Sequence, residues 1–179
     1  MALGKLLAEQ LNQLAVGSPE IAQSLRDAGG SMALVVAAPA AQATLTFADQ
    51  DRYSVTFRTL EVSHGSGSGT VAAQAAALTQ RLAFLEEPLT LIEQSADEQT
   101  AQVRSYPPLR EGDERWYWEV VLQGGNRPSA VIGRYHWAPG MAEREAVAYP
   151  ATFSLVSRIA DALNEALHTN EAEAATGHR

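Results

Sequence analysis

Two stretches of the chain decide the predicted fold: residues 115–123 (RWYWEVVLQ) and residues 127–137 (RPSAVIGRYHW). Both are rich in aromatic and β-branched residues, which favour β-strands. Gly125 and Asn126 lie between them, and this pair is typical of a two-residue turn that joins antiparallel strands. Because apolar residues fall on both faces of the resulting hairpin, we expect it to lie in the middle of a sheet.

The predicted turn also fixes the register of this hairpin. Trp116 then faces Tyr135, and Trp118 faces Gly133, where the missing side chain leaves room for the indole ring. In this register the three tryptophans share one face of the hairpin: Trp116, Trp118 and Trp137.

Hydrophobic periodicity predicts the other elements. Leucines at helical spacing indicate an N-terminal helical hairpin over residues 1–30, and the same spacing predicts helices over residues 71–85 and from Pro150 to Leu167. The remaining strands are expected at residues 32–38, 42–47, 53–62, 89–93 and 100–106.

Sequential hairpins without a strand–helix–strand alternation indicate an α+β domain over residues 1–168. We expect a mainly antiparallel sheet of about six to seven strands with amphipathic helices packed on it. Residues 63–70 are interpreted as a Gly/Ser linker between two halves, and residues 169–179 as a disordered polar tail. In each half the strands come first and a helix comes last. The two halves are therefore alternatively interpreted as a pseudo-duplicated unit of strands followed by a helix. A bulge is expected near Thr59, where the apolar alternation changes phase.

Composition excludes several classes of function. The chain has 179 residues, with 13 Lys and Arg against 21 Asp and Glu, and a formal net charge of -8. It therefore lacks the surplus of cations that nucleic acid or an anionic membrane requires of a partner. The absence of cysteine excludes disulfides, thiolate nucleophiles and cysteine metal sites. With no apolar signal segment after Met1, we expect a cytoplasmic protein.

The glycine-rich loop at residues 64–70 (HGSGSGT) is one candidate site. A phosphate-binding loop needs a Lys after its last glycine, and none occurs here. The loop is therefore interpreted as a flexible connection, with Gly67 and Ser68 kept as candidates for ligand contact. His64 would be a general base if a serine of the loop were a nucleophile. The four histidines do not have the spacing of a metal site, and we expect neither a metal nor a cofactor.

The aromatic hairpin is the other candidate site. It holds all three tryptophans, and such residues occur both in sheet cores and at partner surfaces. In the predicted register Arg134 lies opposite Tyr117 and diagonal to Glu119, within reach of a cation–π contact and an ion pair. Two interpretations stay open, a packed core or a ligand or partner surface, and both involve the same residues: Trp116, Trp118, Arg134, Tyr135 and Trp137.

The function expected from these observations is binding rather than catalysis. The sequence shows no nucleophile with its base, no metal site and no nucleotide loop, while the first helix carries a leucine stripe that suits a core or a partner. We therefore expect a non-catalytic protein-binding or scaffolding domain, chaperone-like and homodimeric. The alternative is a small-molecule-binding domain or enzyme with a pocket between the aromatic hairpin and the helix over residues 71–85.

The expected order of helix, three strands, helix, strands and helix is similar to that of secretion-chaperone-like α+β domains. The resemblance is one of general plan, and it implies a dimer that binds extended polypeptide. The second half departs from this plan, because four strands are expected where two would occur.

Overall fold

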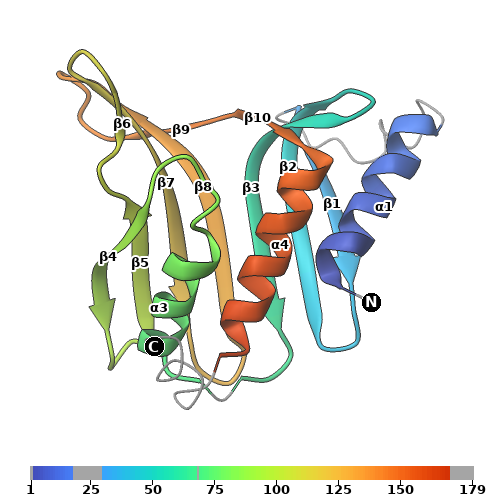
Figure 1. Ribbon diagram of the computed structural model, residues 1–179, viewed down its shortest axis with the longest axis horizontal. Helices are drawn as coiled ribbons and strands as arrows, with labels where there is room; N and C mark the ends of the chain where they lie inside the picture. Colours follow the sequence, from blue (N-terminus) through green and yellow to red (C-terminus); the bar gives the residue numbers. More distant parts are fainter. Residues whose placement is uncertain (1, 18–29, 68, 170–179) are drawn as a thin grey trace.

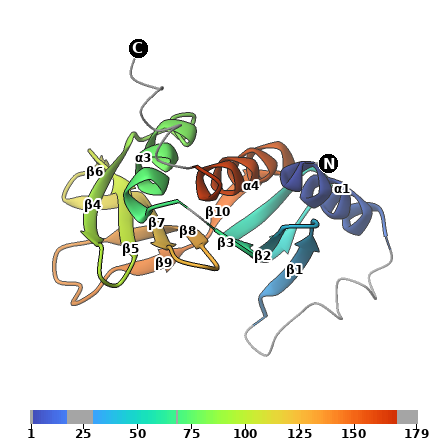
Figure 2. The same ribbon diagram turned by 90° about the horizontal axis from the view of Figure 1, so that it is seen from below.

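The described helices, three in number, lie on one face of a sheet (Figures 1 and 2). The structure is a computed structural model, and it describes residues 2–17, 30–67 and 69–169. The described helices are α1 (Leu3–Val16), α3 (Val71–Arg81) and α4 (Phe153–Leu167). We call the face on which they lie the covered face. No described helix lies on the opposite, open face.

All strand pairs of the sheet are antiparallel. The main path follows the order β1-β2-β3-β8-β7-β5-β4, and β6, β9 and β10 pair beside it. The strands are β1 (Met32–Ala37), β2 (Ala41–Gln50), β3 (Ser54–His64), β4 (Leu89–Ser95), β5 (Thr100–Ser105), β6 (Leu109–Glu111), β7 (Glu114–Gln123), β8 (Ser129–Trp137), β9 (Glu145–Val147) and β10 (Tyr149–Thr152). The predicted α+β fold with helices packed on an antiparallel sheet is confirmed.

The two halves of the sheet meet where β3 pairs with β8. This pairing extends as far as Thr59, which lies opposite Gly133. At the same place the pairing between β2 and β3 shifts, since Thr46 pairs with Thr59 while Phe47 pairs with Phe57. The extra residue in β3 confirms the bulge predicted near Thr59.

Two short strands fill the gap that opens beyond this bulge. β9 continues the pairing of β8, with Val147 opposite Arg134. β10 continues the pairing of β3, with Tyr149 opposite Phe57. One segment of chain therefore supplies partners to both halves where they separate, at the top of the view in Figure 1.

The predicted leucine stripe of α1 faces the core, where Leu3, Leu7 and Leu11 are buried. The helix also packs closely against α4. A Cβ atom at Gly4 would lie 2.1 Å from the backbone oxygen of Ser157, so only glycine fits at this position. The Gly4 N–H donates a hydrogen bond to Asp161 Oδ1 over 2.7 Å, which fixes the start of α1 against α4.

The predicted register of the aromatic hairpin is wrong by one residue. The last pair before the turn is Gln123 with Ser129, so the connection spans residues 124–128 rather than two residues. The predicted register would place Pro128, which has no N–H, inside the ladder. It would also use the N–H of Gly124, which instead donates to the oxygen of Gln99 over 2.7 Å.

The shift in register exchanges the faces of β8 relative to β7. Trp116 lies opposite His136, and Trp118 lies opposite Arg134. Trp137 lies opposite Arg115, so it is on the other face of the sheet from the first two tryptophans. The prediction that all three tryptophans share a face is therefore wrong.

Other element boundaries also differ from the predictions. α3 ends at Arg81 rather than at residue 85. Pro150 lies in β10 and does not open a helix; Thr152 caps α4 instead, and its hydroxyl accepts a hydrogen bond from Leu155 N over 3.2 Å. A short strand, β6, forms where a loop is expected.

Some predictions fall outside the described residues. These are the second helix of the N-terminal hairpin, within residues 18–29, the residue Ser68 and the polar tail from residue 170 onward. Thr169, the first residue of the predicted tail, is buried, and its N–H donates to Ala166 O over 3.1 Å.

Candidate functional site

The predicted site residues fall in three separate places. Trp116, Trp118 and Arg134 lie on the covered face, Tyr135 and Trp137 on the open face, and His64 and Gly67 at the end of the sheet where α3 begins. Ser68 lies outside the described residues. The aromatic residues therefore do not form one surface, because the observed register separates them.

Arg134 is enclosed within the covered face. Only 4% of the residue is exposed, and its guanidinium pairs with Glu87, which is 7% exposed, over 2.8 Å. The same guanidinium lies 5.2 Å from the ring centroids of both Trp118 and Tyr149. Burial, followed by the charge of Glu86, raises the pKa of Tyr149, so this ring stays neutral. Trp118 and Arg134 therefore belong to the core.

The predicted partners of Arg134 are wrong as well. Tyr117 and Glu119 lie on the open face, away from Arg134. The ion-pair partner of Arg134 is Glu87. Glu87 is remote in sequence and stands before Pro88 at the end of the predicted helix, where a carboxylate is usually solvated. No local pattern marks it as the partner.

Glu119 is the centre of a second ion cluster, on the open face. The carboxylate is 1% exposed and accepts hydrogen bonds from Arg104, at 2.8 and 3.0 Å, and from Arg144. Each arginine also covers a tyrosine: Arg104 lies 4.8 Å from the ring of Tyr117, and Arg144 lies 4.6 Å from that of Tyr135. The cluster ties the loop before β9 to the sheet, and its cations are already paired.

His64 lies at the end of β3 and is 3% exposed. Its Nε2 atom lies 2.9 Å from Oδ1 of Asn164, and its ring lies 4.0 Å from the ring of His168. Burial, and secondly His168, lower the pKa of His64 below its usual range. The described contact of His64 is thus to an amide and not to a serine hydroxyl.

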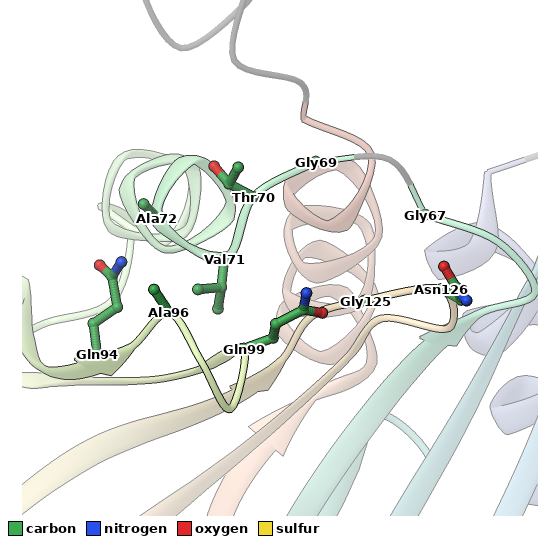
Figure 3. A pocket seen from close by; sticks show the side chains of 10 residues that line it. All are labelled: Gly67, Gly69, Thr70, Val71, Ala72, Gln94, Ala96, Gln99, Gly125 and Asn126. Carbon is green, nitrogen blue, oxygen red and sulfur yellow. The ribbon is translucent and has the colours of Figure 1, made fainter.

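A cleft of about 430 Å³ opens at the same end of the molecule (Figure 3). It lies between the start of α3, the turn from β4 to β5 and the turn from β7 to β8. Its lining residues are Gly67, Gly69, Thr70, Val71, Ala72, Gln94, Ala96, Gln99, Gly125 and Asn126. Of the predicted site residues that the structure describes, only Gly67 contributes to this lining.

The described lining of the cleft is largely apolar and carries three amide side chains, from Gln94, Gln99 and Asn126. None of the described lining residues has a charged side chain. Thr70 caps α3 by accepting a hydrogen bond from Ala73 N over 3.3 Å. Amides donate and accept hydrogen bonds but do not act as general acids or bases near neutral pH. Among the described lining residues, the polar side chains are therefore hydrogen-bonding groups.

The edge strand β1 is a further candidate, which the sequence did not indicate. At its hairpin, Ala38 and Ala41 exchange two backbone hydrogen bonds, of 2.8 and 3.4 Å. Hydrogen-bonded residues alternate along an antiparallel ladder, so the N–H and C=O groups of Ala33, Val35 and Ala37 point away from β2. Among the described residues no strand pairs with them, because β1 ends the sheet.

The two edges of the main sheet differ in their protection. β4 carries Glu93, and its pairing with β5 is shifted after Leu91. β1 (MALVVA) has no charge, no proline and no shift in its register, and Val35 is 56% exposed. Charges, prolines and bulges are the features that prevent an edge from pairing with another strand. Within the described residues, β1 therefore lacks each of these protective features.

No family model, curated protein or solved structure matches this chain. Within the described residues there is no group of three or more His, Asp or Glu placed to hold a metal. None of the described helices has the length and apolar content needed to cross a membrane.

Breaking the Arg134 pair should destabilise the protein strongly. Glu87→Gln leaves a buried guanidinium without its counter-charge, at an expected cost of about 3–5 kcal/mol in the free energy of unfolding. The neighbouring Glu86 is exposed, so Glu86→Gln should cost less than about 0.5 kcal/mol. The double variant Glu87→Leu with Arg134→Met removes both charges and should lose less than Glu87→Gln alone. Urea unfolding measures all three, and a larger loss in the double variant would contradict the account.

His64→Gln should flatten the dependence of stability on pH. Since the pKa of His64 is lowered from 6.5 in the folded state, the unfolded chain takes up the proton first as the pH falls. The free energy of unfolding then declines below pH 6.5, by at most about 1.4 kcal/mol per pH unit for one proton. Chemical unfolding between about pH 5 and pH 8 measures this slope. His168→Gln leaves His64 buried and should keep part of the slope; an unchanged slope in His64→Gln would refute the assignment.

Proposed function

We propose that the protein is a non-catalytic protein-binding module that takes an extended segment of a partner as an additional strand on β1. The observation that carries this proposal is the row of outward backbone groups at Ala33, Val35 and Ala37. Strand addition provides each of these groups with a hydrogen-bond partner, and main-chain hydrogen bonds supply the affinity in such complexes.

The side chains around β1 indicate the chemistry of the bound segment. β1 itself contains only apolar residues, so it offers an incoming strand no charge with which to pair. Val35 on the open face and Leu34 and Val36 on the covered face would flank small or β-branched side chains. The formal net charge of -8 disfavours an acidic segment. The partner segment is therefore an apolar to weakly basic strand.

The general plan of the fold supports the same proposal. The described chain runs α1, three strands, α3, further strands and α4. The order of elements up to α3 resembles that of secretion-chaperone-like domains, which bind extended polypeptide, while the strands after α3 depart from that plan. An apolar, uncharged edge of six residues, such as β1, suits a protein that binds extended polypeptide.

Amide hydrogen exchange tests strand addition. The probe is an end-blocked peptide of alternating Val and Thr with one Lys at each end. When it is added, the amides of Ala33, Val35 and Ala37 should become protected while amides in β4 stay unchanged. Protection elsewhere, or none at these three amides, would overturn the proposal.

A pair of variants sharpens this experiment. Val35→Pro removes an N–H that is not used by β2 and should weaken peptide binding at least tenfold, because the central hydrogen bond is lost. Val35→Thr keeps the N–H and the β-branched side chain and serves as the matched control. Equal affinity in the two variants would show that the backbone of β1 does not bind the peptide.

A second candidate function is the binding of an uncharged small molecule in the cleft, supported by its three amide side chains. Uncharged disaccharides and end-blocked dipeptides are suitable probes. They should shift the NMR signals of Gln94, Gln99 and Asn126, and Gln99→Ala should reduce the effect. Gln10→Ala, on the exposed surface of α1, is the control. If none of these probes shifts the three amides at millimolar concentration, this second function is excluded.

A further inference from the structure

We infer that the strand paired with β1 is β1 of a second copy, in the antiparallel register that places Val35 opposite Val35. The inference rests on the proposed function, because it assigns an occupant to the same edge. It joins two sheets into one continuous sheet across a twofold axis. The consequence is a homodimer whose interface is a backbone ladder.

The geometry of β1 selects this register. In an antiparallel pair, residues that point their backbone groups at the partner must face one another. On β1 these are Ala33, Val35 and Ala37. Pairing Val35 with its own copy sets Ala33 opposite Ala37, so all three residues of each strand are used. A shift by two residues in either direction leaves one of them without a partner on the other β1.

The absence of charge in β1 is what permits a copy of the strand to pair with it. A charged residue at or next to a twofold axis lies close to the same charge of the second copy, which is unfavourable. β1 contains no charged residue, whereas β4 contains Glu93 and an irregular register. Of the two edges of the main sheet, only β1 is therefore compatible with pairing to itself.

The side chains of the two copies are also complementary. On the open face the small Ala33 and Ala37 would flank a central contact between the two Val35 side chains. On the covered face Leu34 would lie opposite Val36 of the second copy, which extends a core that both residues already line. Bulky residues that would block the approach are absent from β1.

Both the size of the contact and the charge of the chain predict a moderate affinity. A single pair of six-residue strands buries less than the roughly 1,600 Å² of a standard interface, so we expect dissociation in the micromolar range. Each copy carries a formal net charge of -8, so added salt should strengthen the dimer by screening this repulsion.

Sedimentation velocity of the full chain tests the inference. The wild-type protein should shift with concentration from 19.2 kDa toward twice that mass. Val35→Lys and Val35→Glu should each raise the dissociation constant at least tenfold, because like charges then meet at the axis. An equimolar mixture of the two variants should dimerise again, since the introduced charges attract. Val121→Lys, at a residue 46% exposed on the open face of an interior strand, should dimerise like the wild type.

The outcomes separate this inference from the proposed function. A wild-type chain that stays at 19.2 kDa throughout the micromolar range overturns the dimer. So does a dimer that is unaffected by both Val35 variants, and failure of the mixture to recover overturns the register. If the dimer is absent but the peptide protects Ala33, Val35 and Ala37, strand addition stands without self-pairing. If the wild-type protein, diluted to its monomeric form, gains no protection at Ala33, Val35 and Ala37 from the peptide, the proposed function itself fails.

Discussion

Every backbone N–H and C=O group in a sheet requires a hydrogen-bond partner, and the architecture of this protein follows from that requirement. Where the bulge near Thr59 separates β3 from β8, each strand would lose its partner on the side that faces the other. β10 pairs with β3 and β9 pairs with β8 on that side. At β1, no described strand pairs with the outward groups. The junction satisfies the requirement with strands of the same chain, whereas the described part of the chain leaves it unmet at β1.

Buried carboxylates in this protein are paired with arginines that lie against aromatic rings. Glu87 and Arg134 are buried beside Trp118, and Glu119 is buried between two arginines that lie over tyrosine rings. Removing a carboxylate from water is costly, and the paired guanidinium offsets most of that cost. Arginine suits the task because its planar group can bond a carboxylate and stack on a ring at the same time. The aromatic residues near these pairs hold charges in position and do not form one exposed surface.

The local patterns of the sequence were sufficient for the longer elements and for the fold class, but not for the short strands β6, β9 and β10. Alternation and helical spacing located β1, β2, β3, β7, β8 and α1, and the change of phase near Thr59 located the bulge. The register of the hairpin failed, because it was inferred from the composition of the turn alone. The connection is lengthened by Pro128, which cannot donate to a ladder, and by Gly124, which bonds to a turn that is distant in sequence.

The candidate site was harder to predict, since it depends on the order of strands. The order of strands places β3 beside β8 rather than β4, and it places no described strand on the outer side of β1. The ion pair of Arg134 joins β8 to Glu87, which is 47 positions away in the sequence. Sequential hairpins do not reveal such a crossover. Of the predicted loop residues, Gly67 lines the cleft and His64 packs against α4, but neither position could be read from a glycine-rich motif.

The closure of the sheet by β9 and β10 also has a consequence for biosynthesis. A ribosome releases β1, β2 and β3 well before β8 and the segment that completes β3. During that interval the emerging chain carries two open edges, at β1 and at β3. Phe57 and Leu60 stay uncovered until α4, the helix that packs on β3, has been synthesised. Pairing between distant segments is slow and leaves apolar surface exposed in the meantime. The time between the synthesis of β3 and that of β10 is therefore the period in which this chain is most open to aggregation or to capture by a folding helper.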